Sequence, residues 1–324
     1  MKKTTRNILT GAGIAVAGIC TAAATTYVLS KKLVEIAMDR KQPAIMQKNM
    51  EKITGSEEFN QFFKSLDSST KKLENSVLEK VEITSFDGTK LVGHWHSCEN
   101  PKRIIVAVHG WRSTWARDFG TASDSWFKND CCVLFVEQRA QGNSGGEYIG
   151  FGLLERYDCL EWIKWVNERT ESKLPIYLCG VSMGATTVLM ASALDLPENV
   201  KGIVSDCAFT SPLDIWKHIA KKNLHVPYGK IFCSVTSALC KQKINYRPDD
   251  YSTLEAMKVC KLPVLFVHGT ADSFVPVEMT YENYKACTAP KRLLIVPGAN
   301  HGMSYCKEKE NYEKATTDFW ADFD

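Results

Sequence analysis

Hydrophobic residues change their spacing near residue 78, and from there short apolar runs alternate with longer amphipathic stretches. Parallel strands that are covered on both faces read as near-continuous apolar runs rather than as alternating ones. The pattern therefore predicts a parallel sheet whose strands are joined by crossover helices, such as the stretch 153–166. The expected strands are 104–108, 133–136, 176–179, 203–205, 264–267 and 293–296.

The segment just before this region predicts an antiparallel hairpin. Val81, Ile83 and Phe86 precede the turn dipeptide Asp87-Gly88, and a second apolar segment, 91–95, follows it. An Asp-Gly pair between two such segments is typical of a hairpin turn. The expected fold class is α/β, with a mostly parallel central sheet, an N-terminal antiparallel hairpin and helices on both faces.

One connection is much longer than a strand-to-helix loop requires. About fifty residues lie between Cys207 and Leu262, which follow and precede the expected strands 203–205 and 264–267, whereas such loops usually have about 2–6 residues. The segment 209–250 carries scattered apolar residues among many lysines. We expect it to form a helical lid over the ends of the strands.

The N-terminal residues 8–29 carry no charge and are long enough to cross a bilayer as a helix. One interpretation is a single-pass membrane anchor. The other is a secretory signal peptide cleaved near Ala22-Ala23-Ala24, which would give a secreted protein. We favour the anchor because the apolar run continues through 27–29. Positive residues on both sides leave the orientation open.

The expected domains are therefore a membrane anchor or signal segment (1–30), a helical spacer (31–77) and a catalytic domain (78–324). The chain has 324 residues, 44% of them hydrophobic and 24% charged, which is ordinary for a globular protein. A net charge of +3 without a basic tail gives no indication of a nucleic-acid partner, so we expect none. The twelve cysteines lack metal-site spacing, so we expect free thiols, no metal and no cofactor.

The most informative motif is Gly180-Val181-Ser182-Met183-Gly184, which follows the apolar run 176–179 directly. Gly-x-Ser-x-Gly between a strand and a helix places the serine hydroxyl at the tip of a sharp turn. The turn is so tight that the residues two before and two after the serine must lack side chains. Ser182 is therefore the candidate nucleophile.

A serine nucleophile needs a base, and the base needs an acid that orients it. On this topology the acid and then the histidine should follow the serine, each after a strand. Asp272 follows the strand 264–267, and His301 follows the strand 293–296. Asp206, at the end of 203–205, is the competing candidate for the acid.

The tetrahedral intermediate of such chemistry needs two backbone N–H donors for its oxyanion. We expect them from Met183, directly after the nucleophile, and from Trp111, in the loop after the strand 104–108. His109 is interpreted as a structural residue. Trp111 and Trp115 are candidates for the wall of an acyl pocket, with aromatic core packing as the alternative.

Five segments together resemble the α/β-hydrolase superfamily: His109-Gly110, 137–144, 180–184, 268–276 and 298–302. The pattern is most similar to the serine aminopeptidase and prolyl-oligopeptidase-like branch, which includes many membrane-tethered bacterial hydrolases. The resemblance implies a serine hydrolase and leaves the substrate open. The chain departs from it at Glu137, where the family usually has Asp, and we interpret Glu137 and Arg139 as structural.

The expected function is hydrolysis of a carboxylic ester through an acyl-enzyme intermediate, with Ser182, Asp272 and His301 as the triad. The alternatives are a peptidase or amidase, an acyltransferase, and a binding module without activity, which the intact triad disfavours. The expected partners are a small ester or acyl substrate and, through the N-terminal segment, the membrane. The lid residues expected to contact the acyl chain are Leu213, Trp216, Val226, Phe232 and Leu239.

Overall fold

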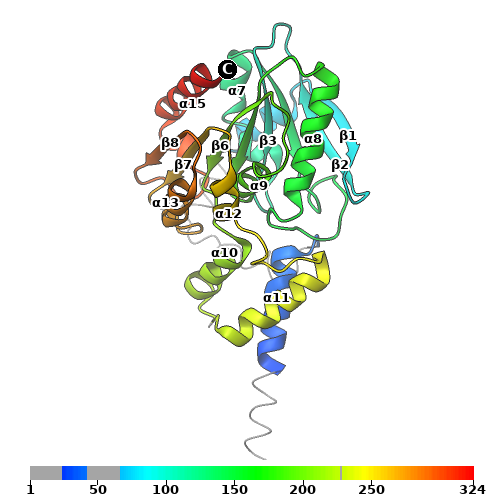
Figure 1. Ribbon diagram of the computed structural model, residues 1–324, viewed down its shortest axis with the longest axis vertical. Coiled ribbons are helices and arrows are strands. Elements are labelled where there is room, and N and C mark those ends of the chain that lie inside the picture. The colour runs from blue at the N-terminus through cyan, green and yellow to red at the C-terminus, as the bar shows by residue number, and fades with distance from the viewer. Residues whose placement is uncertain (1–23, 42–65, 227) are drawn as a thin grey trace, which may run out of the picture.

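A computed structural model describes residues 24–41, 66–226 and 228–324, and its centre is an eight-stranded sheet (Figure 1). The strand order is β1-β2-β4-β3-β5-β6-β7-β8. The first two strands pair antiparallel, β2 pairs antiparallel with β4, and the others are parallel. The strands are β1 (Glu79–Thr84), β2 (Lys90–His96), β3 (Arg103–Val108), β4 (Cys131–Glu137), β5 (Ile176–Val181), β6 (Val200–Asp206), β7 (Val264–Gly269) and β8 (Lys291–Val296).

The sheet confirms the predicted strands, and its two covered faces explain why the strand sequences are apolar at consecutive positions. Along β3, Ile104 and Val106 pack in one core cluster, whereas Ile105 and Ala107 pack in the other. Neighbouring side chains of a strand point to opposite faces, so both sets must be apolar when helices cover both faces. The expected α/β fold class is therefore confirmed.

Each of the two core clusters lies between one face of the sheet and a set of helices. The first face is covered by α8 (Glu155–Thr170), α9 (Met183–Ala191), α12 (Thr253–Val259) and α13 (Val277–Ala286). The second is covered by α5 (Asp67–Glu74), α6 (Trp115–Phe119), α7 (Ser123–Lys128), α14 (Ser304–Lys307) and α15 (Lys309–Phe323).

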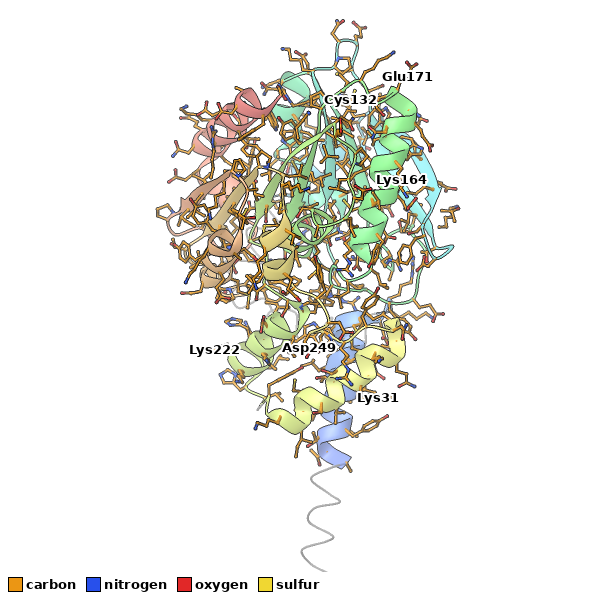
Figure 2. All side chains as sticks on the ribbon, viewed as in Figure 1. Lys31, Cys132, Lys164, Glu171, Lys222 and Asp249 are labelled. Atoms are coloured by element: carbon orange, nitrogen blue, oxygen red, sulfur yellow. The ribbon has the colours of Figure 1, made fainter. Side chains whose placement is uncertain are left out.

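A third group of helices lies beyond the sheet at one end of the molecule (Figure 1). It contains α10 (Pro212–His218), the π-helical turn Ile219–Asn223, α11 (Lys230–Ile244) and the helical residues 24–38. Ser211 caps α10 by accepting the N–H of Asp214, and Pro212 occupies its first turn. The insertion predicted between β6 and β7 is thus helical. Its labelled residues Lys222 and Asp249 lie at the same end as Lys31, opposite Glu171 (Figure 2).

Residues 24–38 form one helix without a break at residue 30, where the sequence predicted a domain boundary. Most of the uncharged run 8–29 lies outside the described residues, as does the spacer segment 42–65. Within the ranges that the structure describes, no helix is both long and apolar enough to cross a bilayer. The membrane anchor therefore stays a prediction.

Candidate active site

Ser182 occupies the turn between β5 and α9, and its backbone has φ 55° and ψ −117°. A positive φ is uncommon for a residue with a side chain and marks a strained turn. A Cβ atom at Gly180 would overlap the carbonyl group of Gly184, and one at Gly184 would overlap the carbonyl oxygen of Val108. The two glycines are therefore required by close backbone contacts, as the motif predicted.

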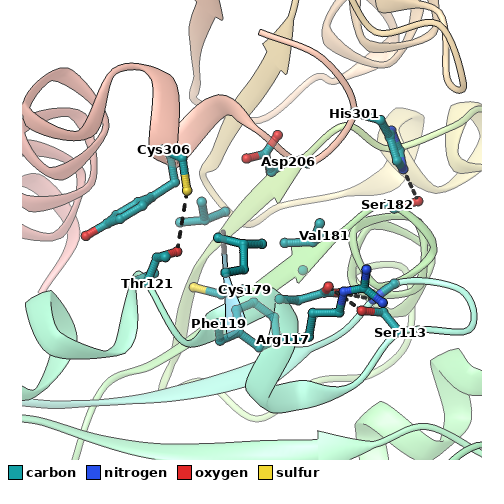
Figure 3. Close-up of a pocket in the computed structure, with 18 of the residues that line it drawn as sticks. Ser113, Arg117, Phe119, Thr121, Cys179, Val181, Ser182, Asp206, His301 and Cys306 are labelled. Atoms are coloured by element: carbon teal, nitrogen blue, oxygen red, sulfur yellow. Dashed lines mark hydrogen bonds between the residues drawn. The ribbon is translucent and has the colours of Figure 1, made fainter. Parts of the chain in front are cut away.

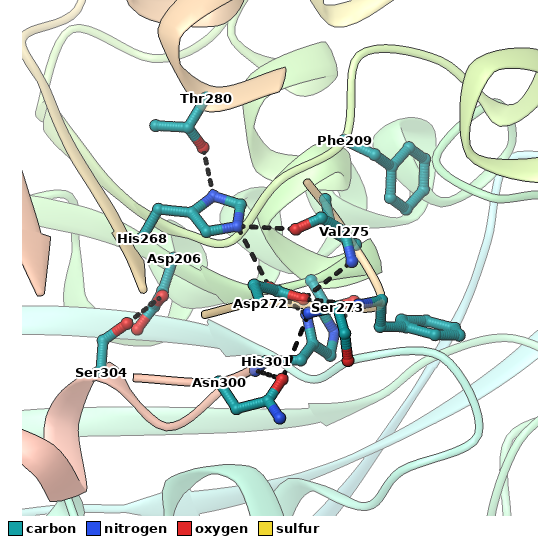
Figure 4. A network of polar contacts seen from close by, with 12 residues as sticks. Asp206, Phe209, His268, Asp272, Ser273, Val275, Thr280, Asn300, His301 and Ser304 are labelled. Atoms are coloured by element: carbon teal, nitrogen blue, oxygen red, sulfur yellow. Dashed lines mark hydrogen bonds and ion pairs between the residues drawn. The ribbon is translucent and has the colours of Figure 1, made fainter. Parts of the chain in front are cut away.

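The side chains of Ser182, His301 and Asp272 form a continuous hydrogen-bonded chain. His301 Nε2 lies 2.9 Å from Ser182 Oγ, and His301 Nδ1 lies 2.7 Å from Asp272 Oδ2 (Figures 3 and 4). The other carboxylate oxygen, Oδ1, accepts the backbone N–H groups of Phe274 and Val275 at 2.9 and 2.8 Å. The structure thus brings together the three residues that the sequence selected from three different strand ends.

Burial alone would raise the pKa of Asp272, but the adjacent His301 and His268 rings hold it well below its ordinary range. Burial alone would lower the pKa of His301, but the charge and hydrogen bond of Asp272 raise it above the ordinary histidine value. An ionised Asp272 favours the His301 tautomer that carries a proton on Nδ1. Nε2 is then free to accept the proton of the Ser182 hydroxyl.

A second histidine, His268 at the end of β7, holds the same carboxylate and was not selected as a site residue from the sequence. His268 Nε2 lies 3.1 Å from Asp272 Oδ2 and 3.0 Å from the carbonyl oxygen of Val275 (Figure 4). Its Nδ1 lies 2.7 Å from the Thr280 hydroxyl. Because the Val275 oxygen can only accept, we infer that Nε2 carries the proton and Nδ1 accepts from Thr280. His268 is therefore a positioning residue for Asp272.

Asp206, the competing candidate for the acid, is also buried but faces a different partner. Its Oδ1 accepts the Ser304 hydroxyl at 3.1 Å (Figure 4). Burial raises the pKa of Asp206, whereas the pKa of Asp272 is lowered. Since Nδ1 of His301 bonds to Asp272, the geometry favours Asp272 as the orienting acid.

One expected oxyanion donor, Met183, directly follows Ser182, and the other, Trp111, directly follows Gly110, which lies beside Ser182. Met183 is the first residue of α9. Its N–H is therefore one of the first helical N–H groups, which have no hydrogen-bond partner within the helix. In the loop after β3, the Gly110 N–H donates to Asp118 Oδ2 at 2.7 Å, which fixes the segment that carries Trp111. A Cβ at Gly110 would lie 3.4 Å from the Cβ of Ser182, so this loop passes directly beside the nucleophile.

Two cavities meet at Ser182, and they differ in chemical character. The larger encloses about 140 Å³ and has a mixed wall, and Figure 3 shows it between Ser182 with His301 and Cys306 with Thr121. Its charged and polar lining includes Arg112, Ser113, Arg117, Asp118, Asp206 and His301.

The second cavity encloses about 80 Å³ and, apart from Ser182, is lined by apolar side chains. They come from the helical residues 24–38, from the loops near the nucleophile and from the lid. The lining residues are Leu33, Ile36, Ala37, Trp111, Phe151, Phe209, Ile215, Trp216, Ile219, Leu224 and Phe274.

Only part of the expected lid wall is found there. Trp216 lines the apolar cavity, as predicted, but Leu213, Val226, Phe232 and Leu239 do not. These four residues lie outside the wall of this cavity because an apolar lid residue can equally pack against other apolar side chains; Leu239, for example, packs against the cluster that contains Trp216 and Met38. Leu213 and Phe232, for instance, pack with Ala220 and Tyr228 in a separate cluster.

Comparisons with known proteins show the family and the fold of the chain. Residues 127–323 match the sequence pattern of the prolyl oligopeptidase family. The chain belongs to this family. Its fold is shared with the Pyrococcus furiosus esterase Pf2001, which is 22% identical with a TM-score of 0.64, over 78% of this chain and 93% of that one. It is also shared with the Pyrococcus horikoshii acylaminoacyl peptidase, at 18% identity and a TM-score of 0.55, over 77% of this chain and 42% of that one.

Two curated proteins are similar in sequence. The uncharacterized protein YqkD of Bacillus subtilis is 27% identical over 187 residues, which cover 58% of this chain and 61% of YqkD. The match thus spans less than two thirds of YqkD. The uncharacterized protein YfhR of Escherichia coli strain K12 is 24% identical over 250 residues, covering 74% of this chain and 80% of YfhR. With the family match, the chain is a serine hydrolase of the α/β-hydrolase type.

The departure of this prolyl oligopeptidase family member at Glu137 has a structural explanation. Glu137 Oε1 lies 2.7 Å from His94 Nε2 and 3.0 Å from the Asn143 side-chain amide. Arg139 pairs with both carboxylate oxygens of Asp158, each at 2.6 Å. Both residues therefore make buried structural contacts at the end of β4, in line with their interpretation as structural.

The remaining aromatic and histidine candidates also contact the core. Trp115 stacks on His94 with ring centroids 4.2 Å apart and lines neither cavity. Of the two interpretations of Trp115, the structure therefore supports aromatic core packing. His109 is buried, and its Nε2 accepts the backbone N–H of Gln138 at 3.2 Å. His109 is thus structural, as expected.

One group of side chains has the spacing of a metal site. Ligand atoms of Cys207, Asp272 and His301 lie within 4.8 Å of one another. Burial raises the pKa of the Cys207 thiol well above its ordinary value, so the thiolate that binds metals is disfavoured. Asp272 and His301 bond to each other. The donor set therefore fits a proton relay better than a metal ion.

Proposed function

We propose that this protein hydrolyses carboxylic esters through an acyl-enzyme intermediate on Ser182. The observation that carries the proposal is the relay from Ser182 Oγ to His301 Nε2 at 2.9 Å and from His301 Nδ1 to Asp272 at 2.7 Å. In this proposal Ser182 is the nucleophile, His301 is the general base and acid, and Asp272 orients the imidazole.

In the acylation step, Ser182 Oγ attacks the carbonyl carbon while His301 Nε2 takes the hydroxyl proton. The carbonyl oxygen becomes an oxyanion, which the N–H groups of Met183 and Trp111 are proposed to bind. The bond to the alcohol oxygen then breaks, and His301 returns the proton to the departing alcohol. In deacylation, water gives a proton to His301, attacks the acyl carbon and releases the acid, and Ser182 Oγ takes the proton back.

The wall of the apolar cavity supports an ester substrate. A peptidase that reads a free amino group needs a carboxylate on the acyl side of the nucleophile, and the lining of this cavity offers none among the described residues. A peptidase or amidase is the second candidate, because the acylaminoacyl peptidase shares the fold and the larger cavity carries Asp118 and Asp206.

The test is to label the purified protein with a fluorophosphonate and then to compare p-nitrophenyl esters with p-nitroanilides of the same acyl groups. We expect labelling, rapid ester cleavage and much slower anilide cleavage. The Ser182→Ala variant should lose turnover by a factor of about 10⁶. The matched control is Ser234→Ala, whose exposed hydroxyl on α11 bonds to the Lys230 carbonyl.

Three outcomes would contradict parts of the proposal. Ester hydrolysis by Ser182→Ala within tenfold of the parent would remove Ser182 as the nucleophile. Faster cleavage of the anilides would favour the peptidase or amidase. Transfer of the acyl group to an added alcohol in preference to water would favour an acyltransferase.

A further inference from the structure

The helical residues 24–38 precede the hydrolase domain, yet one face of this helix is built into the active site. Val34 and Met38 are fully buried, at 0% and 1% exposure. Leu33, Ile36 and Ala37 line the apolar cavity beside Ser182. Positions three and four apart share one face of a helix, so Leu33, Ile36 and Ala37 form one apolar stripe on the cavity wall, and Val34 and Met38 are buried in the adjoining cluster.

The C-terminal end of this helix is held by the loop that carries the expected oxyanion donor. The Trp111 ring N–H donates to the Ala37 carbonyl at 2.8 Å. The Arg112 guanidinium donates to the carbonyls of Ile36 and Asp39, at 2.7 and 2.6 Å. The last carbonyls of a helix lack partners within the helix and carry partial negative charge, so a cation at this position stabilises the contact.

Further contacts fix the same end from the lid and from the loop after β4. The Asp39 carboxylate pairs with Lys243 of α11 at 2.7 Å. The backbone N–H of Ile149 donates to the Met38 carbonyl at 2.7 Å, and the N–H of Arg40 donates to the Glu147 carbonyl at 2.8 Å. The helix is thus held on three sides, and its apolar stripe forms a fixed wall.

The position of His301 indicates which cavity takes which half of an ester. His301 must return its proton to the departing alcohol, so the alcohol has to lie beside His301 Nε2. His301 lines the larger, mixed cavity and is not among the lining residues of the apolar one. Ser182 lines both. The acyl half of a substrate bound to Ser182 is therefore directed into the apolar cavity.

We propose that the apolar cavity binds the aliphatic chain of an acyl group, and that Leu33 and Ile36 limit the chain length it accepts. The inference rests on the proposed ester hydrolysis and adds a substrate class to it. It assigns a specificity role to a helix outside the segment 127–323 that matches the family.

The experiment uses the full chain and changes the volume of the apolar cavity only by substitutions in the N-terminal helix. The filling variants are Leu33→Trp and Ile36→Trp, and the enlarging variant is Ile36→Ala. The control is Val28→Trp, on the same helix, because Val28 is 49% exposed and is not part of the cavity. The kcat/KM of each variant is measured with p-nitrophenyl esters from acetate to dodecanoate.

We expect the filling variants to lose activity on the longer esters by about tenfold or more relative to acetate, because a hydrophobic pocket discriminates by fit. Ile36→Ala should move the optimum toward longer chains, and Val28→Trp should leave the ranking unchanged. Fluorophosphonate labelling of Ser182 should persist in every variant. Ile36→Ala removes atoms only, so it tests the pocket even if a tryptophan prevents folding.

The failure of this inference differs from the failure of the proposed function. If the parent protein is not labelled and cleaves no ester, the proposed function is wrong and the acyl pocket is wrong with it. If all variants cleave esters with the parent's ranking of chain lengths, ester hydrolysis stands and the acyl pocket is overturned.

Discussion

Asp272 is the residue on which the polar network of the site converges. Its carboxylate accepts two backbone N–H groups and contacts the rings of both His268 and His301. A carboxylate with so many donors stays ionised although it is buried. His268 adds a contact that leaves the carboxylate fixed in one orientation, which in turn fixes the imidazole of His301.

The raised pKa of His301 predicts the pH dependence of activity. Only the neutral imidazole can accept the serine proton, so kcat/KM should rise with pH through an apparent pKa above the ordinary histidine value of 6.5. Asp272→Asn removes the charge that raises this pKa, so the rising limb should move to lower pH. The rate should fall by a factor of about 10⁴ because the wrong tautomer is favoured.

The matched control for this prediction is Asp206→Asn, which changes a buried carboxylate that bonds to Ser304 instead. It should reduce the rate far less than Asp272→Asn does, and circular dichroism should show that both variants are folded. A larger loss from Asp206→Asn would mean that Asp206 is the orienting acid.

At the scale of elements, the turn from β5 to α9 depends on the close approach of β3. A side chain at Gly184 would overlap the Val108 carbonyl, so Gly184→Ser should lower the free energy of unfolding by about 3 kcal/mol or more. Gly229→Ser is the control, because a Cβ there meets nothing within 4 Å and serine is a favourable cap for α11. Urea denaturation measures both, and equal stability of the two variants would contradict the prediction.

The lid contains apolar residues with two different roles, which a pair of substitutions separates. Trp216 lines the cavity beside Ser182, whereas the Phe232 ring packs on Tyr228 with centroids 4.9 Å apart. We expect Trp216→Ala to change the ranking of ester chain lengths. Phe232→Ala should lower stability by about 3–5 kcal/mol and leave that ranking unchanged. Chain-length profiles and thermal denaturation together provide the check, and a changed ranking in Phe232→Ala alone would reverse the assignment.

At the scale of the whole molecule, we propose that the uncharged run 8–29 anchors the protein in a membrane. The described helix keeps apolar side chains on its surface at this end, since Tyr27, Val28 and Leu29 are 50%, 49% and 43% exposed. Full-length protein should stay in the membrane fraction after a carbonate wash, because about 20 apolar residues suffice to span a bilayer. A mature N-terminus at Thr25 would instead establish a signal peptide.

The parallel sheet was predictable because its signal is local. Six apolar runs at the right spacing required strands covered on both faces, and all six are strands of the sheet. Ser182, Asp272 and His301 were predictable for a related reason. Parallel strands place their carboxyl ends at one edge, so residues that follow three such strands come together there.

The roles of individual apolar residues could not be predicted in the same way. The hydrophobic effect requires that the apolar face of a helix be buried, but it is non-directional and does not specify against what. The sequence therefore predicted a helical spacer over 31–77 and a lid with scattered apolar residues, without partners for either. Only the tertiary structure decided that one face of the N-terminal helix and Trp216 share a cavity beside Ser182, while Phe232 packs inside the lid.

The sequence by itself determined the fold class and selected the three side chains that the structure brings together, because each depends on a short pattern and on the geometry of parallel strands. Only the tertiary structure decided which side chains contact these three residues and which ones hold the surrounding segments in place. His268 contacts Asp272 through the turn after β7, and Arg112 holds the carbonyls at the end of a helix more than seventy residues away. The Arg112 contacts join segments that lie too far apart along the chain for a local sequence pattern to predict them. His268 is only four residues from Asp272, but the orientation of its ring depends on Val275 and Thr280, which the tertiary structure brings to it.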